Sequence, residues 1–340
     1  MKILAIETSC DETAVAILDN RKILSNKIFS QNVIHKMYGG VIPEIAARNH
    51  VDKLPYLIED AIKESSIKLK DLKAIAVTGG PGLIGGIMIG VMYAKTLAAI
   101  LKKQFISVNH LEGHALTIRL INKHIKYPYL LLLVSGGHCQ IITVHYLGYY
   151  EIMGTTLDDA VGEAFDKVAK MLSLDYPGGP KIEKYAKLGD EWSYLLSKPL
   201  LHKKNCNFSF SGLKTSVLNK IKIISKLSNK SKYNISASFQ KTVADILIDK
   251  LYQASEIFIQ KYKSNKKRIV ISGGVASNYY IRIKINKYFS EKNFIVTYPP
   301  INLCTDNAVM IGYAAYERLL TGYKSNLKFL PQSRWAISEI

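Results

Sequence analysis

The sequence predicts an α/β protein with about two domains. Three short apolar segments of strand-like composition each run into a hydroxyl-glycine-glycine turn; these turns are Thr78-Gly79-Gly80, Ser135-Gly136-Gly137 and Ser272-Gly273-Gly274. In α/β proteins, glycine turns at strand ends next to helices are where phosphates and nucleotides bind. At 340 residues, of which 48% are apolar, the chain is long enough to bury roughly two hydrophobic cores.

The N-terminal segment predicts a β-hairpin. Residues 2–6 and 14–18 have strand-like composition, and the turn between them contains hydroxyl groups together with Asp11 and Glu12. Such a turn can offer backbone amides and hydroxyls to a phosphate, while its carboxylates hold a cation or a polar group of a substrate. An ordinary acidic hairpin loop is the alternative that this segment alone favours.

The next elements predict a helix, a buried strand and a second helix. Residues 51–65 carry apolar side chains at helical spacing, and residues 74–77 form a short apolar strand. The uncharged stretch of residues 74–94 is long enough to cross a bilayer, but it contains six glycines and a proline. We therefore expect a strand, a glycine turn and a helix that ends at residue 100, and no membrane span.

A pair of histidines predicts one part of a metal site. His110 and His114 would lie on one face of a helix, one turn apart, where both imidazoles can bind the same ion. Protein metal sites usually supply three or four ligands, so another group must come from elsewhere in the chain. Taken alone, such a pair is more often two solvated or hydrogen-bonded histidines.

The second half of the chain repeats the plan of the first. Residues 129–134 and 140–144 predict two strands around the turn at Ser135. Residues 268–271 predict a further strand, followed by a glycine turn and a helix. The repeat suggests two similar α/β units.

Two aspartates in this half have two interpretations each. Asp166 lies in a helix predicted at residues 157–170, where it either contacts a ligand or pairs with Lys170. Asp306 precedes an apolar C-terminal helix, so it is either the N-terminal cap of that helix or the missing metal carboxylate.

The chain is strongly basic, with a net charge of +19 from 46 basic and 27 acidic residues. Lysines cluster near aromatic residues, which suits a phosphate backbone with unstacked bases; the clusters are Lys203-Lys204, the lysines between Lys214 and Lys232, and Lys261 to Arg268. If these clusters bind nucleic acid, changing Lys203, Lys204, Lys266 and Lys267 to glutamate should weaken binding. A lysine-rich but merely solvated surface is the alternative.

Cysteine use and the N-terminus predict a cytoplasmic protein. The four cysteines include no C-x-x-C pair, so neither a disulfide framework nor a thiolate zinc site is indicated. The short apolar run before Glu7 is too short and wrongly flanked for a signal peptide.

Eight motifs along the chain are recognisable as a set. They are Ile6-Glu7-Thr8-Ser9-Cys10-Asp11-Glu12-Thr13, Gly80-Pro81-Gly82-Leu83, Asn109-His110-Leu111-Glu112-Gly113-His114, Leu133-Val134-Ser135-Gly136-Gly137-His138, Gly162-Glu163-Ala164-Phe165-Asp166-Lys167, Asp175-Tyr176-Pro177-Gly178-Gly179-Pro180, Phe208-Ser209-Phe210-Ser211-Gly212-Leu213-Lys214 and Cys304-Thr305-Asp306-Asn307. In this order they closely resemble the bacterial branch of the TsaD family, formerly described as O-sialoglycoprotein endopeptidases. The resemblance extends over nearly the whole chain, as far as Arg334-Trp335.

The resemblance implies a fold and a domain organisation. It implies a two-lobed actin-like, sugar-kinase-like (ASKHA) fold of the α/β class, with duplicated lobes and a ligand cleft between them. Residues 1–109 and about 300–340 would form the N-terminal lobe, and residues 110–299 the C-terminal lobe.

The resemblance also implies an activity. Members of this family transfer a threonylcarbamoyl group from threonylcarbamoyl-AMP to the N6 amine of the adenosine next to the anticodon, in tRNAs that read codons starting with adenine. AMP is released. The chain would accordingly be a tRNA-modifying acyltransferase.

The site residues follow from the same resemblance. The metal would be one iron ion per subunit, with zinc or another divalent ion as the alternative, held by His110, His114 and Asp306. If the C-terminal helix returns to the first lobe, we expect this ion to tie the two lobes together. Asp11 and Glu12 match an acidic motif that we interpret as catalytic. The donor-binding residues would be Leu133, Val134, Ser135, Gly136, Gly137, Asp166, Gly179 and Asn278. An ion on two neutral imidazoles and one carboxylate keeps positive charge and open positions for a carbonyl or phosphate oxygen.

The implied partners are tRNA and three proteins. A smaller TsaB-like paralogue would bind the N-terminal lobe, a TsaE-like ATPase would reset the complex, and a TsaC/Sua-type enzyme would supply threonylcarbamoyl-AMP. The helix expected at residues 51–65 is one candidate docking surface, although packing on the chain's own core is the commoner use of an amphipathic helix.

Two other functions compete with this interpretation. A metalloprotease needs a glutamate directly after its first histidine, but here Leu111 follows His110, and Glu112 comes one place later, about 100° further around a helix. An actin-like ATP-binding module would explain the glycine turns, but it would leave the histidine pair and the basic clusters without a role.

Overall fold

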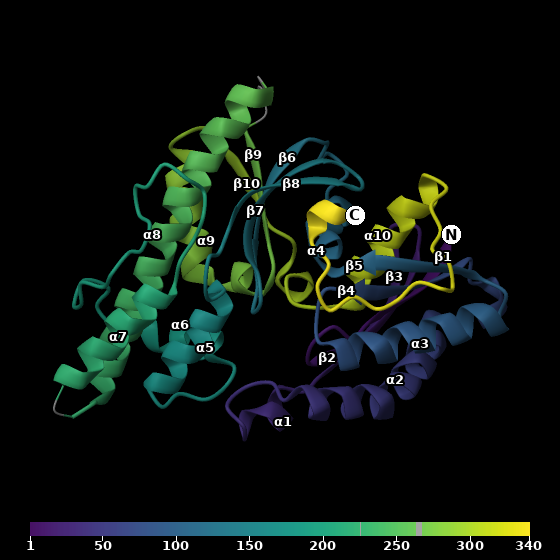
Figure 1. Ribbon diagram of the computed structural model, residues 1–340, viewed down its shortest axis with the longest axis horizontal. Coiled ribbons are helices and arrows are strands. Elements are labelled where there is room, and N and C mark those ends of the chain that lie inside the picture. Colours follow the sequence, from purple (N-terminus) through teal and green to yellow (C-terminus); the bar gives the residue numbers. More distant parts are fainter. Residues whose placement is uncertain (225, 263–266) are drawn as a thin grey trace. The chain divides into compact units, whose positions relative to one another are not determined.

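Two five-stranded sheets organise the computed structural model, which describes residues 1–224, 226–262 and 267–340 (Figure 1). The first sheet has the order β3-β2-β1-β4-β5, with β1 at Lys2–Glu7, β2 at Glu12–Asp19, β3 at Lys22–Ser30, β4 at Ala74–Gly80 and β5 at Gln104–Asn109. The second has the order β10-β9-β6-β7-β8, with β6 at Tyr129–Val134, β7 at Cys139–Tyr146, β8 at Tyr149–Thr155, β9 at Arg268–Ser272 and β10 at Ile295–Thr297.

The two sheets share one topology. In the first, β1 pairs antiparallel with β2 and parallel with β4; in the second, β6 pairs antiparallel with β7 and parallel with β9. Each sheet therefore begins with a hairpin and continues with parallel strands on its other side. This confirms the predicted α/β class and the predicted duplication.

Ten α-helices surround these sheets within the described ranges. They are α1 at Asn32–Lys36, α2 at Pro43–Ser65, α3 at Ile84–Ile100, α4 at His110–Ile121, α5 at Val161–Met171, α6 at Gly178–Ala186, α7 at Ser211–Ile223, α8 at Asn229–Tyr262, α9 at Tyr279–Ser290 and α10 at Ala308–Leu320. No helix among the described residues combines the length and apolar character needed to span a bilayer. The uncharged segment became β4 and α3, as the glycines predicted.

Side-chain alternation along β1 explains how the first sheet is covered on both faces. Leu4 and Ile6 join a core formed with α2 and α3, while α10 packs against β1, β2, β4 and β5. Small side chains line the α10 side: a Cβ added at Gly312 would lie 3.1 Å from the Cβ of Ala5. The helix can therefore approach the sheet closely, which brings its N-terminus near the ends of the strands.

The second sheet has its own core, built on β6, β7 and β9. Helix α8, of 34 residues, contacts β6 and β7 and also packs on α6 and α9. Phe165, Phe208 and Phe239 are buried in this core, so the aromatic side chain of Phe208 serves packing.

The chain divides into two compact units, and the boundary differs from the predicted one. Unit 1 comprises Met1–Lys126, Leu147–Tyr149 and Asp306–Ile340, and unit 2 comprises Tyr127–Tyr146 and Tyr150–Thr305. Helix α4 therefore belongs to unit 1, whereas the sequence placed residues 110–126 in the other lobe. The physical reason is that α4 packs on α10, where the buried Glu112 carboxylate accepts two hydrogen bonds from Arg318, of 2.6 and 3.0 Å.

Candidate metal centre and donor site

Three parallel strands of unit 1 end side by side and carry polar residues at their carboxyl ends. Ile6 is in register with Val77 in the β1–β4 pair, and Gly80 with Asn109 in the β4–β5 pair. Glu7, the last residue of β1, is thereby placed beside Thr78 of β4 and near the start of the helix that follows β5. Ligand sites of open α/β sheets form at such strand ends.

The predicted histidine pair lies on one face of α4, which begins immediately after β5. The Asn109 side chain caps this helix by accepting hydrogen bonds from the backbone N–H groups of Leu111 and Glu112. One turn apart, the His110 and His114 rings have their centroids 4.8 Å from one another, and both side chains are buried. The cap therefore fixes the first turn on which both imidazoles depend.

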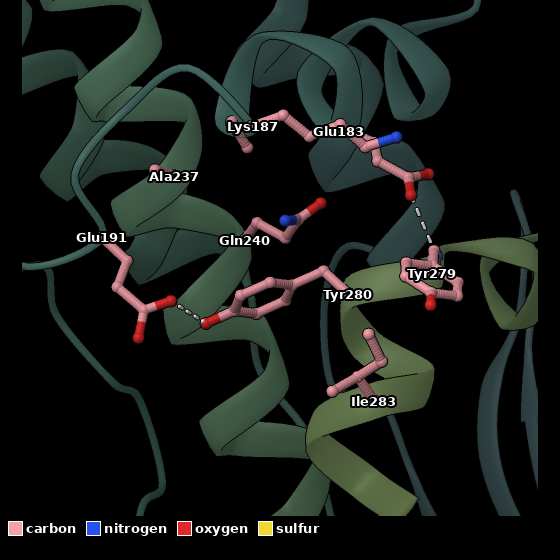
Figure 2. Close-up of a pocket in the computed structure, with 9 residues that line it drawn as sticks. Glu183, Lys187, Glu191, Ala237, Gln240, Tyr279, Tyr280 and Ile283 are labelled. Atoms are coloured by element: carbon pink, nitrogen blue, oxygen red, sulfur yellow. Dashed lines mark hydrogen bonds between the residues drawn. The ribbon is translucent and has the colours of Figure 1, made fainter.

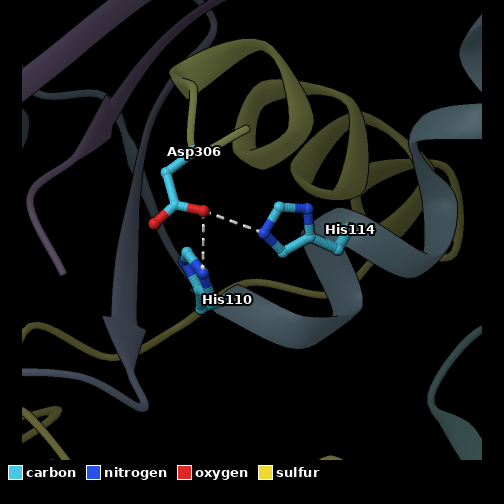
Figure 3. Close-up of side chains that lie close together, drawn as sticks. All are labelled: His110, His114 and Asp306. Atoms are coloured by element: carbon cyan, nitrogen blue, oxygen red, sulfur yellow. Dashed lines mark hydrogen bonds and ion pairs between the residues drawn. The ribbon is translucent and has the colours of Figure 1, made fainter. Parts of the chain in front are cut away.

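Asp306 meets both histidines, although almost 200 residues separate it from them in sequence. Its Oδ1 atom lies 3.0 Å from Nε2 of His114 and 3.5 Å from Nε2 of His110 (Figure 3). Asn307 rather than Asp306 caps α10, with its side chain accepting from the backbone N–H of Met310 at 3.1 Å. The capping interpretation of Asp306 is therefore wrong.

All three residues belong to unit 1. The expectation that an ion on them would tie the two lobes together was wrong, because α4 and α10 both pack within the same unit.

The three side chains fit a divalent metal ion by chemistry and spacing. One donor atom from each of His110, His114 and Asp306 lies within 4.8 Å of the others. Two imidazoles with one carboxylate suit iron(II) or zinc and leave coordination positions for other ligands. That an ion binds here remains a prediction, which the geometry supports.

Burial and mutual contact shift the pKa values of Glu7, His110 and Asp306. Burial by itself would raise the pKa of Glu7 and of Asp306, but the neighbouring His110 outweighs it and lowers both, Asp306 to well below its usual value. Burial would lower the pKa of His110, yet the two carboxylates raise it well above the ordinary value. A metal ion would compete with that proton, so metal binding should weaken as the pH falls.

Asp11 and Glu12 form a separate carboxyl pair at the start of β2. Asp11 is buried, and burial together with the charge and hydrogen bond of Asp11 raises the pKa of Glu12 well above its usual value. Asp306 also raises the pKa of Glu12 through its charge. A buried carboxyl with a raised pKa, such as that of Glu12, is suited to moving a proton.

The predicted donor residues all lie in unit 2, at the end of β6 and in the turn after it, in α5, at the start of α6 and at the N-cap of α9. Added Cβ atoms at Gly136 and Gly137 would meet nothing within 4 Å, so the backbone of this turn is open to a ligand. Gly273 adopts a φ of +98°, and an added Cβ there would lie 2.3 Å from the carbonyl oxygen of Val134. Only glycine allows this close approach of the two turns.

Several of the predicted donor residues use their side chains inside the protein instead of presenting them to a ligand. Leu133 and Val134 have fully buried side chains within β6, so only their backbone is available to a ligand. Asp166 accepts a hydrogen bond of 2.7 Å from the backbone N–H of Gly178, at the start of α6, where Gly179 has open space beside it. Asn278 caps α9 and donates from Nδ2 to Oε1 of Gln240, 2.9 Å away.

A cavity that the sequence did not predict adjoins Asn278. It has a volume of ≈ 240 Å³ and lies between α6, α8 and α9 (Figure 2). Its lining comprises Glu183, Ala186, Lys187, Glu191, Ala237, Gln240, Tyr279, Tyr280 and Ile283. The Tyr280 hydroxyl donates a hydrogen bond of 2.6 Å to Glu191. Burial, and to a smaller extent this hydrogen bond, raises the pKa of Tyr280.

The sequence has close relatives with one name. A statistical description of the TsaD family, "tRNA N6-adenosine threonylcarbamoyltransferase", matches residues 22–313. The chain is 52% identical over 342 residues to the protein of that name from Rickettsia conorii, covering 100% of this chain and 99% of the relative. A second relative with the same name, from Rickettsia bellii, is 51% identical over 340 residues with the same coverage. The chain belongs to the TsaD family.

Solved structures place this TsaD family member in the actin-like, sugar-kinase-like fold class. HypF from T. kodakarensis superposes with a TM-score of 0.64 at 14% identity, covering 94% of this chain and 48% of HypF. A ROK hexokinase from Thermus thermophilus has a TM-score of 0.52 at 13% identity, covering 95% of this chain and 100% of the hexokinase. At such low identity these likenesses show the fold alone, and they confirm the predicted fold class.

Two features of the structure were not predicted from the sequence. No role was predicted for Glu7, although a carboxylate at the end of an apolar strand is unusual enough to signal one. The cavity-lining residues of α8 and α9 were also missed, because their side chains converge only in three dimensions.

Asp306→Asn should remove the bound metal without unfolding the protein. Asparagine retains an oxygen but loses the negative charge that offsets the cation, while Asn307 continues to cap α10. After equilibration with Zn²⁺ and dialysis, metal analysis should find the variant depleted, with a melting temperature close to that of the unaltered protein.

The neighbouring variant Asn307→Ser is the matched control, because serine also caps helices and position 307 contributes no proposed ligand. It should keep its metal. Full occupancy with normal activity in Asp306→Asn would show that Asp306 is not a ligand.

Proposed function

We propose that this chain transfers a threonylcarbamoyl group from an adenylate donor to the N6 amine of an adenosine in tRNA, with AMP as the leaving group. Its membership of the TsaD family carries the proposal, and the convergence of His110, His114 and Asp306 supports it. In the reaction, the amine nitrogen bonds to the carbonyl carbon of the donor. The bond from that carbon to the phosphate oxygen breaks, and AMP leaves with the electron pair.

The residues of unit 1 would hold a metal ion and a proton acceptor. His110 and His114 would each contribute Nε2, and Asp306 a carboxylate oxygen. A bound divalent ion, iron or zinc, supplies Lewis-acid polarisation of a carbonyl or phosphate oxygen. The Asp11–Glu12 pair would take up the proton that the adenosine amine loses, because burial and the neighbouring Asp11 raise the pKa of Glu12.

The residues of unit 2 would bind the donor. The open backbone at Gly136 and Gly137 offers N–H groups to the phosphate, as does the start of α6 at Gly179. We place the adenosine part of the donor in the neighbouring cavity, where Gln240 and Tyr280 combine hydrogen-bonding groups with apolar surface. Asp166 would act by holding the α6 N-terminus through Gly178 rather than by contact with the donor.

The tRNA would bind through the basic part of unit 2. No aspartate or glutamate occurs between Glu191 and Asp245, and the intervening segment carries ten lysines. Lys198 and Lys241 pair with Asp245, and Lys214 pairs with Asp159. Among the described residues no carboxylate forms an ion pair with the exposed lysines of this segment, which are Lys203, Lys204, Lys222, Lys226 and Lys230. These five charges are therefore available to phosphates.

The protein partners complete the proposal. We propose a TsaB-like paralogue, a TsaE-like ATPase and a TsaC/Sua-type source of threonylcarbamoyl-AMP as partners of the chain. The apolar face of α2 packs on the chain's own core through Leu54 and Ala61, so a partner would bind the exposed Val51 and Tyr56 instead.

A direct assay of three activities tests the function. The purified chain should release AMP and modify tRNA when given threonylcarbamoyl-AMP, and it should complete many turnovers only with the TsaB-like and TsaE-like partners. Peptide cleavage, or ATP hydrolysis without tRNA modification, would instead support the metalloprotease or the ATP-binding module.

Glu12→Gln should lower kcat by about 100-fold while metal content is unchanged, because only proton transfer is affected.

Filling the cavity should weaken donor binding. Ile283→Trp adds bulk at a half-exposed position that lines the cavity, so it should raise KM for the donor by about tenfold and leave tRNA affinity unchanged. Ile257→Trp is the matched control, since Ile257 is similarly exposed (49% against 46%) but does not line the cavity. Equal KM values for the two variants would contradict this placement of the donor.

Charge reversal at the basic segment should weaken tRNA binding. The four changes first expected to do so include Lys266, which lies outside the described residues, and Lys267, which packs over the Phe294 ring. We therefore choose Lys203→Glu, Lys204→Glu, Lys222→Glu and Lys230→Glu. Together they should lower tRNA affinity by at least about tenfold at low salt and flatten its salt dependence, while KM for the donor is unchanged.

The control for that experiment reverses four exposed lysines of unit 1, namely Lys63, Lys70, Lys73 and Lys102. Both variants undergo the same change in net charge, so only the position of the charge differs. Equal losses of affinity would mean that overall charge, and not this surface, attracts tRNA.

A further inference from the structure

The Glu7 carboxylate makes three hydrogen bonds in a site with no solvent exposure. Its Oε1 accepts from the backbone N–H of Ser9 at 2.6 Å, and its Oε2 accepts from the Thr78 hydroxyl and lies 2.9 Å from Nδ1 of His110. An ionised carboxylate can only accept hydrogen bonds. The His110 nitrogen facing it must therefore carry a hydrogen.

We propose that Glu7 is a positioning residue that keeps the hydrogen of His110 on Nδ1 and thereby presents Nε2 to the metal. The inference rests on the proposed metal function of His110, His114 and Asp306. Metal-binding histidines are commonly oriented in this way, by a carboxylate or carbonyl that accepts from the nitrogen not bound to the metal.

His114 has no comparable partner, which makes the role of Glu7 specific. Nδ1 of His114 is buried and has no hydrogen-bond partner among the described residues, so its ring is held only from the Nε2 side. Ser9 Oγ lies 3.2 Å from Nδ1 of His110, but a hydroxyl can donate or accept and does not by itself decide where the hydrogen resides.

Glu7→Gln should reverse the hydrogen position on His110. The backbone N–H of Ser9 cannot become an acceptor, so the glutamine carbonyl oxygen must face it. The amide NH₂ is then directed toward Thr78 and His110, which makes Nδ1 an acceptor and moves the hydrogen to Nε2. A ring with hydrogen on Nε2 and none on Nδ1 cannot offer Nε2 to the metal.

Glu7→Asp provides the discriminating comparison. Aspartate is shorter by one methylene, so it fits the buried site less well, but it retains an acceptor-only carboxylate. A merely structural role predicts that the isosteric Glu7→Gln is the milder change. A positioning role predicts the opposite order.

The test measures two quantities on the full chain. Histidine-selective ¹⁵N labelling and NMR report the hydrogen on Nδ1 of His110 in the metal-free protein, with assignments made from His110→Ala. Competition with a chromophoric chelator reports Zn²⁺ affinity at fixed pH. His145 serves as an internal reference, since it belongs to unit 2, with its Nε2 2.9 Å from Oε2 of Glu151 and its Nδ1 2.8 Å from the Tyr262 hydroxyl.

We expect Nδ1 of His110 to carry hydrogen in the unaltered protein and in Glu7→Asp, and to lose it in Glu7→Gln, while the His145 signals remain unchanged. Zn²⁺ affinity should fall by about 100-fold in Glu7→Gln and by no more than about tenfold in Glu7→Asp. An unchanged Nδ1 hydrogen or an unchanged Zn²⁺ affinity in Glu7→Gln would overturn the inference. Failure of the unaltered protein to bind Zn²⁺ would instead overturn the metal proposal, and the NMR measurement on metal-free protein separates the two results.

Discussion

The hydrogen bond between Glu7 and His110 joins the sheet of unit 1 to its candidate metal centre. It forms because parallel strands β1, β4 and β5 end at one edge of the sheet, which places Glu7, Thr78 and Asn109 together. A buried carboxylate is costly unless donors surround it, and here a backbone amide, a hydroxyl and an imidazole do so. The strand ends therefore fix the orientation of the imidazole before any ligand arrives.

The third metal-binding candidate depends on close packing between α10 and the sheet. Gly312 faces Ala5 and Leu18, so the helix axis approaches the strands more closely than larger side chains would permit. The bidentate Glu112–Arg318 pair holds α4 against α10 in the buried interface. Asp306, just before α10, reaches both histidines as a consequence of this packing.

Local sequence patterns predicted much of the fold but few of its long-range contacts. The strands at β1, β4, β6 and β9 and the helix carrying His110 were expected from composition and spacing, because strand and helix periods are local properties. Helix α2 begins at Pro43, earlier than the predicted residue 51, since its first turns lack a clear apolar period. The glycines of the Asp175–Pro180 motif favour a turn, yet α6 begins at Gly178, because glycine costs little in the first turn of a helix.

In the candidate site, too, local spacing could be predicted from the sequence, whereas contacts between residues distant in sequence could not. The i, i+4 spacing of His110 and His114 is visible in sequence, whereas the approach of Asp306 came from family resemblance and needed the fold to place it. Local spacing could not exclude the cap interpretation of Asp306, because Asp306 and Asn307 are both good capping residues. Burial of Leu133 and Val134, and the roles of Glu7 and Gln240, depend on neighbours distant in sequence.

The central claim is that His110, presented by Glu7, binds one metal ion together with His114 and Asp306. X-ray absorption spectroscopy of the full chain loaded with one equivalent of Zn²⁺ tests it most directly. We expect two imidazole nitrogens at about 2.0–2.1 Å, oxygen ligands at about 2.0–2.2 Å and no sulfur. A sulfur ligand at about 2.3 Å, or imidazole signals that persist in the His110→Ala, His114→Ala double variant, would contradict it.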